Sequence, residues 1–232
     1  MSQSRRLGVR PQRRNRLARF RNASRSVPLL VGCTLLATLV AAGPGSHGDF
    51  EGETDVGGPL RAGSVDFDAA RGEYRITGGG TIMWEQKDEF HFLWRRASGD
   101  LTLTANLAFP HPGGNVDKKA GWMVRQNLGP SAPYADLVVH GSGLTSLQYR
   151  LAENGATEEI QSKTSMPETI RLVRQGNTFA LWASRVGGPL ELAGTVEVPL
   201  HDPVYVGFAV CARDADALEE AVFSNVSMIE HK

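Results

Sequence analysis

Polar side chains that could bind a ligand recur at alternate positions in three successive segments of the chain. The segments are 119–125, 134–140 and 144–151, and the side chains are Arg125, Asp136, His140, Gln148 and Arg150. Residues two apart on a strand point to the same face, so these five form one polar patch if the strands are neighbours in register. Arginine and glutamine can hydrogen-bond sugar hydroxyls or a carboxylate, and an aromatic side chain such as Trp84 can stack on a sugar ring. These six are the predicted ligand-binding residues.

Two interpretations of this polar patch stay open. On the curved sheet of a jelly roll, such a face can form a groove that holds a ligand. The patch can equally be the ordinary solvent-facing side of an antiparallel sheet, which is polar because it meets water. The distinguishing observation is whether the sheet that carries Arg125 and Arg150 is concave and open.

Motifs for enzymatic chemistry are weak, and we predict no catalytic residue. A glycosidase needs two carboxylates about 5 to 9.5 Å apart across a cleft. The nearest pattern, Asp214-x-Asp216-x-x-Glu219, falls between predicted strands and is typical of a solvated loop. The HGSG run at 140–143 joins two strands, whereas the serine elbow of a hydrolase joins a strand to a helix.

No metal and no cofactor are predicted. The six histidines are scattered, without the paired spacing of zinc ligands. Calcium bound among loop acids such as Asp214 and Asp216 is left open. Cys211 lies in an apolar run with no activating base beside it in the sequence, which predicts a buried, inert thiol.

Alternation of apolar and polar residues from residue 50 onwards predicts the strands that position these side chains. The runs include 64–68, 73–77, 119–125, 134–140, 144–151, 157–161, 168–175, 178–184, 191–198, 203–211 and 221–228. No segment has a convincing helical period, and parallel sheets need crossover connections. An all-β fold of two stacked antiparallel sheets is therefore predicted. Trp94, Trp122 and Trp182 lie in apolar strands and are predicted to be core residues.

Ten short segments follow one another in an order that is specific as a set. They are FEGETDVG (50–57), YRITGGG (74–80), MW (83–84), DEFHF (88–92), GD (99–100), GWMVR (121–125), HGSGL (140–144), IRLVR (170–174), VYVG (204–207) and AVFSNV (221–226). Together they resemble the concanavalin A-like (lectin/glucanase) sandwich domain of exported bacterial proteins, which often stands ahead of a TolB-like β-propeller. The resemblance implies a jelly-roll sandwich, an extracytoplasmic location and a binding or interaction role.

The first 48 residues differ in charge from the rest of the chain. They carry nine arginines and no lysine, aspartate or glutamate, which leaves 16 basic against 25 acidic residues in the remainder. Residues 27–42 are an uncharged run that we interpret as part of a signal peptide, with an uncleaved membrane anchor as the alternative. The acidic remainder repels phosphate, so nucleic acid is not an expected partner. We predict a leader over 1–48 and one β-sandwich domain over 49–230.

These observations predict an exported, periplasmic or secreted, non-catalytic β-sandwich module that binds a carbohydrate or another component of the cell envelope. Two alternatives remain, a protein-interaction or structural module of the envelope and a glycoside hydrolase. The expected partner is a glycan or an envelope protein. Membrane contact is expected only through residues 27–42, if they are not cleaved.

Overall fold

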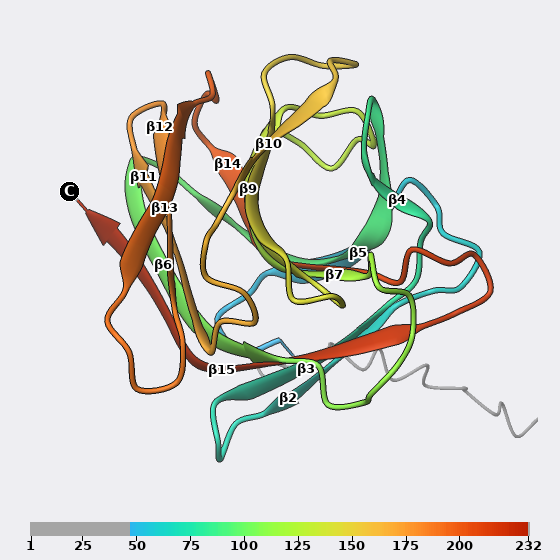
Figure 1. The fold of residues 1–232 in the computed structure, drawn as a ribbon. Coiled ribbons are helices and arrows are strands. Elements are labelled where there is room, and N and C mark those ends of the chain that lie inside the picture. The colour runs from blue at the N-terminus through green and yellow to red at the C-terminus, as the bar shows by residue number, and fades with distance from the viewer. Residues whose placement is uncertain (1–46, 232) are drawn as a thin grey trace, which may run out of the picture. The chain divides into compact units, whose positions relative to one another are not determined.

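The computed structural model describes residues 47–231, which form two β-sheets packed face to face (Figure 1). The strands of the first sheet are β1 (Gly52–Val56), β4 (Ile82–Trp84), β5 (Lys87–Ala97), β7 (Lys119–Arg125), β8 (Tyr134–His140), β9 (Thr145–Arg150), β10 (Thr157–Gln161) and β14 (Val204–Cys211). The strands of the second sheet are β2 (Ser64–Asp68), β3 (Glu73–Gly78), β6 (Asp100–Ala108), β11 (Thr169–Gln175), β12 (Thr178–Ser184), β13 (Glu191–Glu197) and β15 (Glu219–His231). The predicted signal or anchor segment 27–42 lies outside the described residues.

Strand pairing is antiparallel in both sheets. The first sheet has the order β1-β5-β14-β7-β8-β9-β10 with β4 beside β5, and the second has the order β13-β12-β11-β6-β15-β3-β2. Residues 47–231 contain no helix, and so no helix long and apolar enough to cross a membrane. The predicted all-β fold of two antiparallel sheets is confirmed.

An aromatic stack holds the two sheets together. Phe208 of β14 lies with its ring centroid 4.0 Å from that of Trp122 on β7 and 3.8 Å from that of Phe223 on β15. All three side chains are fully buried, and burial of each large apolar side chain contributes about 1.5–3 kcal/mol. The stack therefore ties the centre of the first sheet to the second sheet.

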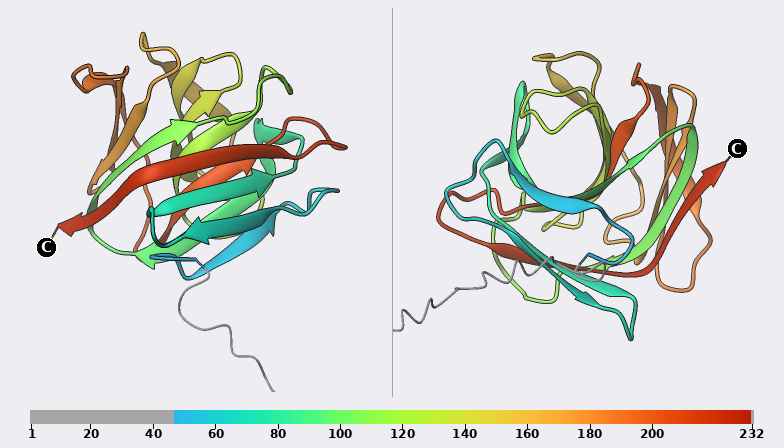
Figure 2. Two further views of the ribbon diagram at one scale, coloured as in Figure 1. Left: turned by 90° about the horizontal axis from the view of Figure 1, so that it is seen from below. Right: turned by 180° about the vertical axis from the view of Figure 1, so that it is seen from behind.

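The first sheet curls until its concave face encloses a second apolar cluster. In Figures 1 and 2, β4, β5, β7, β9 and β10 follow one another around a ring. The cluster inside includes Met83, Phe90, Phe92, Met123 and Val138, none of which is exposed. Strands β7 and β14 are thus covered on both faces, which explains the continuous apolar run in β14.

Two glycines lie where the curled sheet leaves no room for a side chain. A Cβ at Gly121 on β7 would lie 1.8 Å from the carbonyl oxygen of Leu137, and a Cβ at Gly207 on β14 would lie 1.8 Å from that of Leu93. Both contacts are with backbone atoms of the first sheet, which cannot swing aside as a side chain can. Only glycine fits these two positions without moving a strand.

The predicted core role is correct for Trp122 and wrong for Trp182. On β12 the buried apolar positions are Phe179, Leu181 and Ala183, so Trp182 has the opposite parity and lies half-buried on the outer face of the second sheet. Trp94 is half-buried on the concave face, where its ring packs edge-on against Tyr205 at 5.0 Å. The apolar residues beside each tryptophan in the sequence did not indicate on which face of the sheet its side chain lies.

Candidate functional site

Strand register brings the predicted polar residues onto one concave face. One row across β7, β8, β9 and β10 is Arg125, Tyr134, Arg150 and Thr157, and the next is Met123, Asp136, Gln148 and Glu159. Lys119 lies opposite His140 at the other end of β7 and β8. The structure thus gathers all five of the polar residues singled out from the sequence.

Trp84 joins the same site from β4. A pocket of about 250 Å³ opens at the Lys119 end of the concave face. It is lined by Trp84, Asp117, Lys119, His140, Leu144, Gln148, Glu159 and Arg213. The Lys119 Nζ lies 5.3 Å from the centre of the Trp84 ring, so the amine and the indole belong to one small space. Three of the six predicted residues therefore line one pocket.

The interpretation of the polar patch as a solvent-facing side is wrong. Arg125, Asp136 and Arg150 have no exposed surface, and Gln148 is only 1% exposed. The sheet is concave, as the groove interpretation required, but its centre is closed. Ligand access is left only to the pocket at one end, and ligand binding by the six residues stays a prediction.

A buried ion cluster closes the opposite end of the ring. Arg150 donates from Nη1 and Nη2 to the two carboxylate oxygens of Asp88, each at 2.8 Å, and Arg125 Nη2 donates to Asp88 at 3.3 Å. All three side chains are fully buried. A bidentate arginine–carboxylate pair in such surroundings is strong and directional. We call Asp88, Arg125 and Arg150 the arginine plug.

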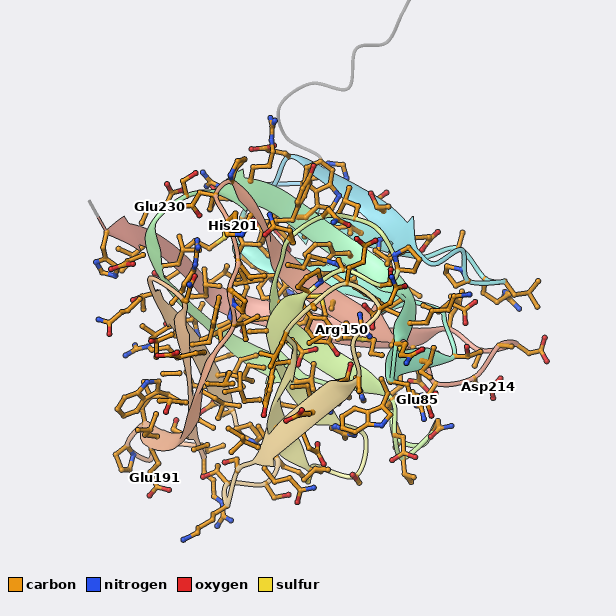
Figure 3. The ribbon with its side chains drawn as sticks, turned by 90° about the horizontal axis from the view of Figure 1, so that it is seen from above. Glu85, Arg150, Glu191, His201, Asp214 and Glu230 are labelled. Atoms are coloured by element: carbon orange, nitrogen blue, oxygen red, sulfur yellow. The ribbon has the colours of Figure 1, made fainter. Side chains whose placement is uncertain are left out.

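The turn between β4 and β5 is bound to the far edge of the sheet through the same plug. The carbonyl oxygen of Glu85 accepts hydrogen bonds from Arg150 Nη2 at 3.1 Å and from Thr157 Oγ1 of β10 at 2.9 Å. Figure 3 shows Glu85 and Arg150 close together. Glu85 has a φ of 55°, a backbone conformation that is uncommon outside glycine. The ring is therefore closed from β4 to β10.

Hydrogen bonds link the groups around the pocket. Lys119 Nζ donates to the carbonyl oxygen of Met83 at 2.7 Å and to Gln148 Oε1 at 2.9 Å. Gln148 Nε2 in turn donates to Glu159 Oε2 at 3.4 Å and lies 3.5 Å from His140 Nε2. Lysine, amide and carboxylate thus form a chain whose outer member, Glu159, is half-buried at the pocket wall.

Buried polar atoms without a hydrogen bond of standard geometry gather on the concave face. Among the described residues they include both oxygens of Asp136, Nδ1 of His140, Nε and Nη1 of Arg125 and Oγ of Ser146. Each such atom costs about 1–3 kcal/mol if it stays unpaired. His140 also lines the pocket while being 7% exposed.

Burial sets the protonation of three groups at the site. It raises the pKa of Asp136 well above its usual value, although the charge of Lys119 opposes the shift. It lowers the pKa of His140 to about 4, an effect that the charge of Lys119 reinforces. Burial also lowers the pKa of Lys119, against the attraction of Asp136. His140 is therefore a neutral imidazole at neutral pH.

Glu159 is shifted in the opposite direction from Asp136. Burial raises its pKa, but hydrogen bonds from Gln161 and Gln148 outweigh burial and leave the pKa below its usual value. Glu159 is therefore ionised at neutral pH. The pocket then presents two cationic groups, Lys119 and Arg213, and two acidic groups, Asp117 and Glu159, around a neutral imidazole.

Sequence reasoning missed several residues of the site, among them Lys119, which lies on the same strand face as Arg125 but was not included in the predicted set. Asp88 shares its strand face with Phe90 and Phe92, and an acid on an apolar face needs a cationic partner, which is the signal that could have found it. Glu159 alternates on β10 with Thr157 and could have been included in the polar patch. Glu85 acts through its backbone, and Arg213 lies between strands, so no sequence signal marked either of them.

The weak chemical motifs have structural roles or lie at the surface. Glu219 begins β15 and accepts a hydrogen bond from Lys118 Nζ at 2.8 Å, which corrects its assignment to a loop. Asp214 and Asp216 are exposed, and within residues 47–231 no three histidine, cysteine or acidic residues gather to hold a metal. Cys211 is a buried free thiol whose pKa is raised by burial to about 11, so it is unreactive as predicted.

Solved structures share this fold at low sequence identity. A functionally unknown protein from Saccharomyces cerevisiae matches 78% of this chain over 97% of its own, with 18% identity and a TM-score of 0.58. The carbohydrate-binding module CBM66 from Bacillus subtilis matches 78% of this chain over 96% of its own, with 17% identity and a TM-score of 0.51. GH43B of a Bacteroides ovatus xyloglucan PUL matches 72% of this chain over 34% of its own, with 16% identity and a TM-score of 0.54.

These likenesses establish the class of fold. Residues 47–231 form a jelly-roll sandwich of the concanavalin A-like type, as the sequence resemblance implied. No family model matches the chain, and no curated protein matches it in sequence.

Proposed function

We propose that this chain is an exported, non-catalytic β-sandwich module that binds a carbohydrate in the pocket at the open end of the concave sheet. The observation that carries the proposal is the composition of the pocket wall. Trp84 offers an apolar ring, while Lys119, His140, Gln148 and Glu159 offer donors and acceptors within a space of about 250 Å³. Sugars present the complementary combination of apolar C–H faces and hydroxyls that both donate and accept.

Two further lines support the proposal. A carbohydrate-binding module has this fold, and so does a part, 34%, of the GH43B chain. The export part rests on the nine arginines that precede the uncharged run 27–42. The arrangement of the pocket favours binding over reaction, because its only half-buried acid, Glu159, is held by hydrogen bonds from two glutamines.

The test is binding of the full chain to mixed-linkage β-glucan, xylan and amylose, measured by calorimetry. We expect binding to at least one of the three. The variant Gln148→Met keeps the size of the side chain and removes its hydrogen-bonding groups, so it should weaken that binding by about tenfold or more. Failure of the wild-type chain to bind any of the three polysaccharides would contradict the proposal.

A second candidate function is glycoside hydrolysis, and one observation favours it. Asp136 and Glu159 occupy one row of the sheet, on either side of Gln148, and their pKa values are shifted in opposite directions. A neutral acid facing an ionised carboxylate is the usual arrangement of a glycosidase. Asp136 does not line the pocket, however, which is why binding is the first proposal.

Reducing-sugar release from the same polysaccharides separates the two functions. Hydrolysis predicts turnover that Glu159→Gln abolishes, whereas binding alone predicts no release of sugar by the wild-type chain. The variant Glu230→Gln, in an exposed acid of β15, serves as the matched control for loss of a carboxylate.

A further inference from the structure

We propose that the pocket takes the terminal unit of a neutral glycan rather than an internal segment of the chain. This inference rests on the proposed function and concerns which part of a carbohydrate enters the same pocket. It follows from the closure of the curled sheet, which blocks the concave face on one side of the pocket. A polymer that passes through a binding site needs an open path on both sides.

The first barrier to a passing chain is the arginine plug. Beyond the pocket, the concave face is filled by Asp88, Arg125 and Arg150, which are fully buried. The loop over residues 126–133 covers them, since Arg125 Nη2 donates to the carbonyl oxygen of Gly129 at 2.6 Å and Arg150 Nη1 donates to that of Ala132 at 3.1 Å. A glycan cannot extend along the concave face past this point without breaking these contacts.

The second barrier is the joining of the sheet edges. A cleft that crosses the strands of a concave sheet is open at both sides only if its two flanks stay apart. Here the turn between β4 and β5 is hydrogen-bonded to β10 through Glu85 and Thr157. The flanks of the first sheet therefore meet, as the ring in Figure 1 shows.

The buried groups of the pocket require a unit that enters rather than one that lies across the mouth. Gln148, Lys119 and His140 are 1%, 3% and 7% exposed. A sugar resting on the rim would contact Trp84 and Glu159 but would not reach these three side chains. The pocket of about 250 Å³ is below the ~300–1,000 Å³ of typical ligand sites, which suits one small unit.

The charge around the pocket favours a neutral unit. Its two cationic and two acidic side chains balance in number, so the pocket wall carries no net positive charge that would attract a sugar carboxylate. The chain beyond residue 48 carries 25 acidic against 16 basic residues and repels acidic polysaccharides over longer distances. The ligand class is thus the end of an uncharged glycan chain or of a short branch.

The test varies the number of polysaccharide chain ends while the mass of polysaccharide is held constant. Mixed-linkage β-glucan, xylan and amylose are each used intact and after partial acid hydrolysis that raises the number of ends about tenfold. We expect the amount of full-chain protein bound per gram at saturation to rise about tenfold with the number of ends. Oligosaccharides of two and six units from the same polymer should bind with affinities within about twofold of each other.

The outcomes separate this inference from the function on which it rests. One outcome would overturn end recognition and leave carbohydrate binding intact. In it, the amount of protein bound per gram is the same for intact and hydrolysed polymer, and the affinity for oligosaccharides rises with each sugar unit up to six. Absence of binding to every intact and hydrolysed probe would overturn both. The variant Trp182→Ala, on the outer face of the second sheet, is the control and should bind as the wild type does in every arm.

Discussion

Asp136 is the residue whose chemistry depends most on its surroundings. Its carboxyl group has no exposed surface and makes no hydrogen bond of standard geometry, and burial raises its pKa well above the usual value. The folded protein therefore favours the protonated acid. The unfolded chain ionises this group at an ordinary pKa near 4. Stability contributed by the protonated form is complete below that pH and declines as pH rises towards the folded pKa.

The variant Asp136→Asn should consequently gain stability over the wild type as pH rises. The amide resembles the protonated acid in shape and does not ionise. Between about pH 4 and the folded pKa, each pH unit should add about 1.4 kcal/mol to the difference in unfolding free energy, in favour of the variant. Urea denaturation at pH 4, 6 and 8 measures this difference. A difference that stays constant with pH would contradict the buried, neutral state of Asp136.

Trp84 is the residue expected to contribute most contact area to a bound sugar. It is half-buried at the pocket wall, and the amine of Lys119 lies over its ring. The variant Trp84→Ala should weaken binding to the preferred polysaccharide by roughly tenfold or more, because aromatic contacts are worth about 0.5–1.5 kcal/mol beyond the area that they bury. Calorimetry measures the loss. Unchanged affinity in Trp84→Ala, together with loss in Trp182→Ala, would move the binding surface to the second sheet.

At the scale of elements, the turn between β4 and β5 decides the shape of the site. It delivers Trp84 to the pocket, the Glu85 carbonyl to β9 and β10, and Asp88 to the arginine plug. Removal of one member of a buried ion pair leaves the others buried without a partner, which typically costs 3–5 kcal/mol. Asp88 is the one carboxylate of the arginine plug, so both buried arginines depend on it for their counter-charge.

The variant Asp88→Asn should lower the unfolding free energy by about 3–5 kcal/mol, since Arg125 and Arg150 lose their anion. The control is Glu51→Gln, which breaks an ion pair with Arg96 whose side chains are 40% and 60% exposed. Exposed pairs are worth less than about 1 kcal/mol. Urea midpoints of the two variants give the comparison, and equal midpoints would show that the plug does not stabilise the ring.

Sequence alternation predicted the elements well because it reports a local property. The faces of 119–125, 134–140 and 144–151 were assigned correctly, and the register of β7, β8 and β9 brings their polar residues together as required. Alternation does not report curvature, so a curled sheet and a flat sheet look alike in sequence. The polar patch was therefore expected to be an open groove or a solvent-facing surface. Its burial comes from the curvature of the sheet, from the loop over residues 126–133 and from the ring closure by Glu85 and Thr157.

At the scale of the whole molecule, two hydrophobic cores have different structural roles. The core between the sheets, centred on Trp122, Phe208 and Phe223, holds the sandwich. The core inside the ring, with Phe90 and Phe92, supports the site from below. The second sheet contributes no residue to the pocket. All ligand contact is therefore expected on the first sheet and the loops at its edge.

The most direct test is a ¹H–¹⁵N spectrum of the labelled full chain, recorded during titration with an oligosaccharide of the polysaccharide that binds. The chain has four tryptophans, so four indole N–H signals report on four places: Trp84 in the pocket, Trp94 beside Tyr205 on the concave face, Trp122 in the core and Trp182 on the second sheet. We predict that the Trp84 signal shifts on titration while those of Trp122 and Trp182 stay in place. A shift of the Trp182 signal with Trp84 unmoved would contradict the account.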